Sequence, residues 1–292
     1  MRLVGGLLAL GVVMGLGMAL VIWTAWPGPR WLERWSNENA GFGPWASWHP
    51  GMAYARGAWS SPRPLKAHVV RLDLHDPGLE LVVSARTATP DGFRSAWASG
   101  LLRQDGLLAA INATPFKPEP YVPGPVVHTQ GLVFTGGWAV GDPVSNLDAL
   151  VRSRTGAWSL QRGQTVDPQI DLGLGGFLAN LRSGQNLGEM RPRDAVTAVG
   201  LSADRRWMYW LVVDGGQPGY SEGTTPFEAG EMLLKLGATD AILLDGGAST
   251  TLVSAGGWRG VKVMNRPRSP WVTGLQRPIA CALGVRTKAP AR

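Results

Sequence analysis

Apolar and polar positions alternate in short runs from residue 68 onwards, and Gly and Pro separate the runs, which predicts a strand-rich chain. The stretch 68–85 alternates on both sides of Asp76-Pro77-Gly78, a turn sequence, and so predicts a β-hairpin. Further strands are predicted at 107–111, 126–134, 149–154, 158–161 and 176–181. We expect an α+β fold with strand-rich, mixed sheets and few helices.

The clearest pattern is a strand–helix–strand unit between residues 207 and 247. An apolar run at 207–213 is followed by Asp214-Gly215-Gly216, and a second at 241–244 by Asp245-Gly246-Gly247. Between them, Thr225-Pro226-Phe227-Glu228 has the form of a capping box with Pro at the first helical position, before apolar residues at helical spacing. Two strands joined by such a crossover are nearly always parallel.

Parallel strands end at the same edge of a sheet, so we expect Asp214 and Asp245 to emerge together where α/β sheets bind ligands. The two glycines after each aspartate let a ligand approach main-chain N–H groups. In the alternative interpretation, both aspartates are turn residues that accept hydrogen bonds from their own Gly amides. The matched positions of the two copies favour a site, and both interpretations stay open.

The amino-terminal segment predicts attachment to a membrane. Residues 3–26 are apolar and uncharged, and about 20 such residues span a bilayer core. A signal peptide is cleaved after small residues, and bulky residues stand next to the candidate small residues here. An uncleaved signal anchor is therefore favoured over a cleaved signal peptide. The expected organisation is an anchor at 1–26, a tether at 27–66, an extracytoplasmic (periplasmic or extracellular) domain at 67–286 and a tail at 287–292.

Composition narrows the function classes. The 28 basic and 21 acidic residues give a net charge of +7, but no run of five Lys or Arg occurs, which argues against nucleic acid as a partner. The single cysteine, Cys281, excludes a disulfide framework and a Cys-based zinc site, and its apolar neighbours predict a core position. The four histidines lack metal-ligand spacing, so neither a metal site nor a cofactor is predicted.

The segment LVVDGGQPGYSEGTTPFEAGEMLLKLGATDAILLDGGASTTLV (residues 211–253) resembles the phosphodiester glycosidase family, which includes bacterial members associated with exopolysaccharide biosynthesis. Matching pieces occur in the same order at 111–116, 191–196, 265–267 and 277–285, so the resemblance covers about 68–286. The chain departs from the family pattern at a few positions: Ala248 replaces a Gly, Gly216 an Arg, Asp194 a Thr and Cys281-Ala282 an Asn-containing pair.

The resemblance implies hydrolysis of a sugar-1-phosphodiester, or of a phosphate-linked glycan, at the glycosidic bond. Asp245 is the first candidate for the carboxylate that faces the anomeric carbon. Asp214 or Glu222 would be the second carboxylate. Arg193 and Arg277 are candidate phosphate clamps, because a guanidinium group can pair with two phosphate oxygens.

Further substrate contacts are expected around the Gly-rich turns, from Asn112, Ser221, Gly246, Gly247, Ser249 and Thr250. Each assignment has a simpler alternative. Arg193 could pair with a neighbouring acid, Asn112 could cap a strand end, and Glu222 could be solvated. Two other functions also stay open, namely a non-catalytic polysaccharide-binding or export accessory protein and a metal-dependent phosphodiesterase. The expected partners are a glycan or sugar phosphate and, through the amino-terminal helix, a membrane.

Overall fold

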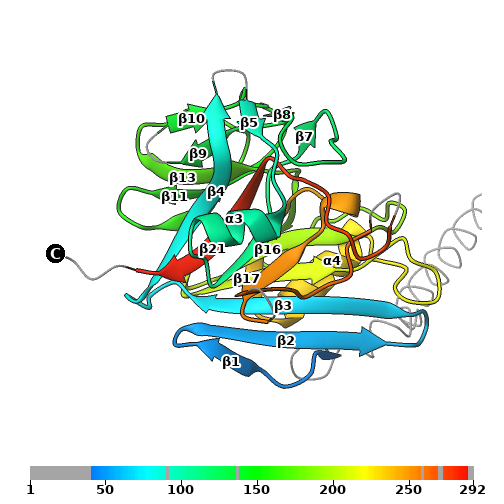
Figure 1. Cartoon of the computed structure of the whole chain (residues 1–292). Helices are drawn as coiled ribbons and strands as arrows, with labels where there is room; N and C mark the ends of the chain where they lie inside the picture. Colours follow the sequence, from blue (N-terminus) through cyan, green and yellow to red (C-terminus); the bar gives the residue numbers. More distant parts are fainter. Residues whose placement is uncertain (1–40, 90–91, 136–137, 258–259, 269–271, 289–292) are drawn as a thin grey trace, which may run out of the picture. The chain divides into compact units, whose positions relative to one another are not determined.

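The computed structural model describes residues 41–89, 92–135, 138–257, 260–268 and 272–288 (Figure 1). The chain divides into two units, Met1–Asn37 and Glu38–Arg292, and the second contains every described residue. The described residues form three sheets and two α-helices, which agrees with the expected strand-rich fold with few helices. The predicted anchor at 3–26 lies outside them, and within them no helix has the length and apolar character needed to cross a bilayer.

The first sheet has eight strands. In spatial order they are β1 (Ala46–His49), β2 (Met52–Trp59), β3 (Leu65–Asp73), β17 (Trp207–Val213), β16 (Val196–Ser202), β18 (Ala238–Leu243), β14 (Ala179–Arg182) and β15 (Gln185–Asn186). Every neighbouring pair is antiparallel, so the expected mixed sheet is wrong here.

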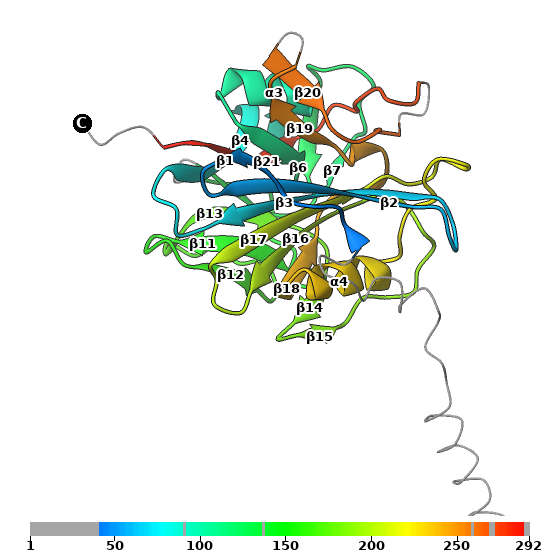
Figure 2. The ribbon, with the colours of Figure 1, turned by 90° about the horizontal axis from the view of Figure 1, so that it is seen from below.

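Two further antiparallel sheets complete the domain. The second contains, in spatial order, β20 (Val261–Val263), β19 (Leu252–Ala255), β6 (Ala109–Asn112), β21 (Cys281–Thr287), β4 (Leu79–Thr89), β5 (Gly92–Arg94), β8 (Val126–Thr129) and β7 (Phe116–Lys117). The third contains β10 (Trp138–Val140), β9 (Val133–Thr135), β13 (Ile170–Gly175), β11 (Ala149–Ser153) and β12 (Trp158–Gln161). Helix α3 (Ala98–Gln104) packs on the second sheet, and α4 (Pro226–Lys235) packs on the first (Figure 2).

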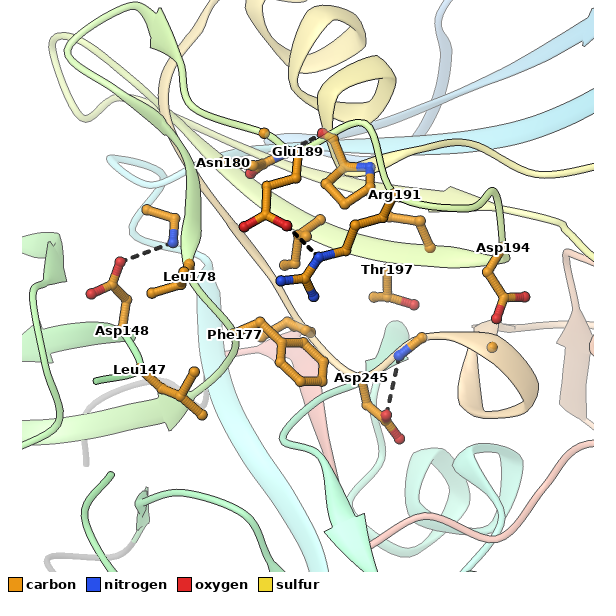
Figure 3. Close-up of a pocket in the computed structure, with 18 of the residues that line it drawn as sticks. Leu147, Asp148, Phe177, Leu178, Asn180, Glu189, Arg191, Asp194, Thr197 and Asp245 are labelled. Atoms are coloured by element: carbon orange, nitrogen blue, oxygen red, sulfur yellow. Dashed lines mark hydrogen bonds and ion pairs between the residues drawn. The ribbon is translucent and has the colours of Figure 1, made fainter. Parts of the chain in front are cut away.

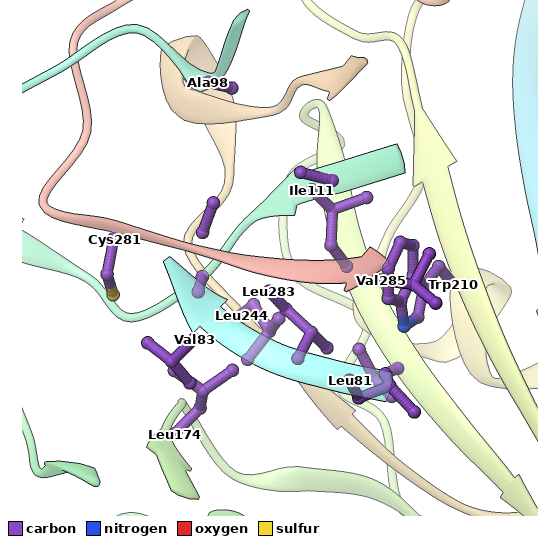
Figure 4. Packing of buried hydrophobic residues seen from close by; sticks show 14 of the residues in the cluster. Leu81, Val83, Ala98, Ile111, Leu174, Trp210, Leu244, Cys281, Leu283 and Val285 are labelled. Atoms are coloured by element: carbon purple, nitrogen blue, oxygen red, sulfur yellow. The ribbon is translucent and has the colours of Figure 1, made fainter. Parts of the chain in front are cut away.

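One apolar core joins the first two sheets. Trp210 of β17 packs with Leu81 and Val285 of the second sheet (Figure 4). Burying each of these side chains contributes about 1.5–3 kcal/mol to stability. Cys281 is fully buried in the same core, as predicted, and burial raises the pKa of its thiol to about 11. All seven residues of β16 are buried because α4 covers one face of the sheet and the core covers the other.

The predicted strand–helix–strand unit is present, with one strand inserted between its two strands. Both β17 and β18 pair antiparallel with β16, so they run parallel to each other without being neighbours. The helix begins where the capping box predicts, since the Thr225 hydroxyl accepts a hydrogen bond from the Glu228 N–H and the Glu228 carboxylate accepts one from the Thr225 N–H. Both strands therefore end at the same sheet edge, as expected.

The predicted hairpin at 68–85 is wrong, although its turn forms. The Asp76 carboxylate accepts a hydrogen bond from the Gly78 N–H at 2.8 Å. The flanking strands then separate, because β3 pairs with β2 and β17 whereas β4 pairs with β21 and β5. The hairpin was predicted from alternation and from the turn sequence, and neither identifies the partner strand.

The predicted tether is also wrong over its second half. Residues 52–59 form β2, which pairs along its whole length with β3, and β1 continues the sheet. Arg63 is buried and forms an ion pair of 2.5 Å with Glu228 at the start of α4. Residues 41–66 are therefore part of the domain, and the boundary predicted at residue 67 falls inside it.

Candidate active site

A cavity of about 1030 Å³ opens at the edge of the first sheet where β16 begins and β18 ends (Figure 3). This volume is at the upper end of the range for small-molecule sites, about 300–1,000 Å³. The wall carries five carboxylates and five arginines: Glu119, Asp148, Glu189, Asp194 and Asp245 with Arg162, Arg182, Arg191, Arg268 and Arg277. Within the described part of the chain, no three His, Cys, Asp or Glu side chains are grouped as metal ligands would be.

Asp245 lies on the cavity wall just after β18. Its backbone is fixed at two points, because its N–H donates to the Ala113 carbonyl at 2.9 Å and its carbonyl accepts from the Asn112 side-chain amide at 2.6 Å. The carboxylate is only 14% exposed, accepts from the Gly246 N–H at 3.1 Å and lies 3.4 Å from Nη2 of Arg277. Burial raises its pKa to about 6, against the opposing effects of Ser249, Arg277 and the Gly246 amide.

Arg277 is the cation that faces this acid. Its Nη2 donates to the Ser249 hydroxyl at 2.7 Å, and its Nη1 donates to the Glu119 carboxylate at 2.8 Å. The guanidinium also stacks on the Phe116 ring, with its central carbon 5.2 Å from the ring centroid. Because Glu119 is 59% exposed, an anionic ligand can displace it from Arg277 at little cost.

The turn after Asp245 brings backbone to the cavity. Gly247 has a φ of +57°, a left-handed conformation that favours glycine, and its N–H donates to the Ala195 carbonyl at 2.9 Å. A Cβ on Gly246 would lie 2.9 Å from the same carbonyl. Gly246, Gly247 and Ala248 all line the cavity, so these glycines let the chain approach β16 closely.

Asp214, the second predicted acid, lies outside the cavity wall. It is 1% exposed, and its carboxylate accepts hydrogen bonds from the Arg266 N–H and the Asn265 side chain, both at 3.0 Å, and from the Tyr220 hydroxyl at 3.2 Å. The aspartate thus anchors the 265–266 segment over its turn. The structure does not bring Asp214 to the cavity wall beside Asp245, and its role as a second carboxylate stays a prediction.

Arg193 and Glu222 also lie outside the cavity wall. They face each other at 3.8 Å, and their side chains are 48% and 41% exposed. The acid that Arg193 faces is therefore Glu222 rather than an immediate neighbour in the sequence. Neither side chain is brought to Asp245 by the fold, so the predicted clamp and the alternative second carboxylate are not supported by this arrangement.

The remaining predicted contacts are mostly internal to the protein. Asn112 is fully buried, and its side-chain oxygen accepts from the Thr197 hydroxyl at 2.7 Å and the Thr251 N–H at 3.0 Å. Ser221 is buried and donates to the Asp214 carbonyl at 2.5 Å. Ser249 holds Arg277, and Thr250 is buried. Of the predicted site residues, the cavity wall contains Asp245, Gly246, Gly247 and Arg277.

Asp194 and Arg268 line the cavity and were not predicted as site residues. Their side chains form an ion pair of 3.4 Å. Arg268 occupies the space above Gly216, where a Cβ would lie 2.0 Å from Nη1. A Cβ on Gly247 would lie 3.4 Å from the Asp194 carboxylate, so this acid lies against the turn that follows Asp245. The sequence offered one signal for this pair of residues. The chain departs from the family pattern at Asp194 and at Gly216, and Arg268 lies against both positions.

A known family profile matches more than half of the chain. The sequence profile described as phosphodiester glycosidase matches residues 105–286. No curated protein sequence matches the chain.

Several solved structures share the fold, among them these three. The catalytic domain of zebrafish N-acetylglucosamine-1-phosphodiester α-N-acetylglucosaminidase, in a form auto-inhibited by its pro-peptide, superposes with a TM-score of 0.63 at 18% identity, over 84% of this chain and 87% of that one. A hypothetical protein from Synechocystis gives 0.56 at 14% identity, over 84% and 64%. A putative exported protein from Burkholderia pseudomallei gives 0.55 at 15% identity, over 77% and 75%. With the family profile matching well over half of its length, the chain belongs to the phosphodiester glycosidase family.

Proposed function

We propose that the chain hydrolyses the glycosidic bond of a sugar-1-phosphodiester or of a phosphate-linked glycan. The observation that carries this proposal is the pair formed by Asp245 and Arg277 on the wall of a large cavity. Family membership supports a glycosidase, and the acid–arginine pair matches the two charges that develop during the reaction. The anomeric carbon becomes positive, and the departing phosphate carries negative charge.

In the proposed reaction the anomeric carbon faces Asp245, which acts as nucleophile or as electrostatic stabiliser. Arg277 exchanges Glu119 for two oxygens of the phosphate. The bond between C1 and the bridging oxygen breaks, and the electron pair leaves with the phosphomonoester. Water supplies a hydroxyl group to C1, and its proton goes to the phosphate or to solvent. A phosphomonoester is a good leaving group, so the reaction depends less on a general acid than ordinary glycoside hydrolysis does.

Asp194 takes the place of the second carboxylate in this scheme. It lines the same cavity and lies against the Gly247 turn, and Figure 3 shows that turn between the Asp194 and Asp245 side chains. The ion pair with Arg268 keeps the Asp194 carboxylate at the cavity wall. From there it can position water or a sugar hydroxyl group.

The domain is proposed to act outside the cytoplasmic membrane, attached through residues 3–26. The apolar length of that segment and the aromatic residues that follow it support this placement. Protease treatment of intact spheroplasts tests it, because an extracytoplasmic domain is digested while a cytoplasmic one is protected.

The function is tested by release of free sugar from a sugar-1-phosphate methyl diester. We expect Asp245→Asn to lower kcat by roughly a thousand-fold or more. Arg193→Ala is the matched control and should leave kcat unchanged, because Arg193 lies outside the cavity wall. Full activity of Asp245→Asn would exclude the proposed role. An unreactive parent chain that still retains glycan would instead favour an accessory protein, and loss of activity in EDTA would favour a metal-dependent phosphodiesterase.

A further inference from the structure

The cavity extends well beyond the acid–arginine pair. Its wall contains Asp148 and Arg162 as well as Asp245 and Arg277. In the view of Figure 3, Phe177 and Leu178 lie between Asp148 and Asp245. A substrate that places its anomeric carbon at Asp245 therefore has room to continue past its phosphate along this wall.

Some of the exposed large apolar side chains of the described residues line this cavity. Tyr121, Phe177, Leu178 and Leu187 are 63%, 40%, 49% and 43% exposed, and all four line the cavity. Apolar side chains that remain open to solvent inside one cavity mark a binding surface for an apolar group.

Phe177 is held firmly next to the acid. Its N–H donates to the carbonyl of Leu243, two residues before Asp245, at 2.9 Å, and its carbonyl accepts from the Asp148 N–H at 3.1 Å. A Cβ on Gly176 would lie 2.6 Å from the Leu243 carbonyl, so glycine permits this close approach. The aromatic ring is thus presented to the cavity by a rigid segment.

Two acids beside the apolar wall, Asp148 and Glu189, are already paired. The Asp148 carboxylate binds Arg182 and the Ala179 N–H, each at 2.8 Å. Glu189 pairs with Arg191, two residues later on the same segment of the wall. A ligand lying along Phe177 and the leucines therefore meets apolar side chains next to two acids that already have partners.

We propose that the substrate's aglycone is aliphatic, an alkyl or isoprenoid chain that lies along Phe177, Leu178 and Leu187 while its phosphate is bound by Arg277. This inference rests on the proposed function and specifies its substrate class. Each methylene group that becomes buried raises affinity roughly four-fold, so even a short chain gives a measurable preference.

The test compares the methyl and octyl diesters of the same sugar 1-phosphate, with the full-length chain and below the micelle concentration of the octyl ester. Two ratios are measured, that of kcat/KM for hydrolysis and that of affinity for Asp245→Asn by calorimetry. We expect both ratios to favour octyl at least ten-fold. Phe177→Ala and Leu187→Ser should each lower the ratios at least three-fold. Trp138→Ala should not, because Trp138 is an exposed apolar residue away from the cavity wall.

Several results would overturn the inference. Octyl-to-methyl ratios near one would exclude an aliphatic aglycone and leave the proposed function intact. A strong octyl preference that Phe177→Ala and Leu187→Ser leave unchanged would place the chain elsewhere. Tighter binding of a nucleoside diphosphate sugar than of the octyl diester would identify a base rather than an alkyl chain. If neither diester is hydrolysed, the proposed function fails, and the calorimetric ratio alone still decides the inference.

Discussion

Burial and ion pairing act in opposite directions on the Asp245 carboxylate. Burial dominates, so the pKa of Asp245 is about 6 in the folded chain, whereas an unfolded chain would show the ordinary value near 4. The folded state consequently binds more protons between these two values. The stability contributed by this group is complete below about pH 4 and declines as the pH rises through about 6.

The raised pKa of Asp245 predicts that activity and stability respond to pH in opposite directions. The kcat/KM of the parent chain should rise as the pH passes through about 6, because the carboxylate must be ionised to stabilise positive charge. Asp245→Asn should be more stable than the parent at pH 8, by at most about 3 kcal/mol, and equally stable at pH 4. Thermal unfolding at both pH values measures this, and a variant less stable than the parent at pH 8 would contradict the assigned burial effect.

The two Asp-Gly-Gly sequences show what residue-level inference can reach. Both aspartates emerge at one sheet edge, as the crossover rule predicts, but only Asp245 lines the cavity. Asp214 is covered by Asn265 and Arg266, which lie about 50 residues later in the sequence. Nothing near Asp214 indicates that cover, so its role could not be separated from that of Asp245 by local pattern.

At the level of elements, α4 is tied to the amino-terminal part of the domain by a buried ion pair. Arg63 and Glu228 are 7% and 2% exposed in their side chains, and Glu228 also closes the capping box. Removing the cation leaves a buried carboxylate without its partner. Breaking such a pair from one side costs about 3–5 kcal/mol.

Arg63→Ala should accordingly lower the free energy of unfolding by about 3 kcal/mol or more. Arg191→Ala serves as the control, because its pair with Glu189 is 64% and 55% exposed and should contribute less than about 1 kcal/mol. Urea unfolding followed by circular dichroism compares the two variants. Equal, small effects would show that Arg63 does not anchor α4.

Elements with local signals were predicted well, and elements defined by distant partners were not. Thr225, Pro226 and Glu228 specify the start of α4 within four residues. By contrast, β16 is a buried run whose place between β17 and β18 depends on the close approach that Gly200 allows, with a Cβ there lying 2.8 Å from that of Ala238. Such a contact has no counterpart in the local pattern.

For the molecule as a whole, the first sheet begins well before the predicted domain start. Strand β2 covers the edge of β3, whose Val69 and Val70 are fully buried, and β1 extends the sheet beyond β2. A chain that starts at Glu38 should therefore unfold cooperatively and remain monodisperse, whereas one that starts at Ala67 should aggregate. Gel filtration and thermal unfolding distinguish them. A stable, cooperative chain from residue 67 would show that β1 and β2 are dispensable.

The central claim concerns which bond breaks in this cavity, and hydrolysis of a sugar-1-phosphodiester in water enriched in oxygen-18 tests it directly. Mass spectrometry of the two products locates the heavy oxygen. The account predicts that the label enters the released sugar at C1 and that the phosphomonoester retains only ordinary oxygen. Label found in the phosphate would mean that the P–O bond is cleaved, and would contradict the role assigned to Asp245.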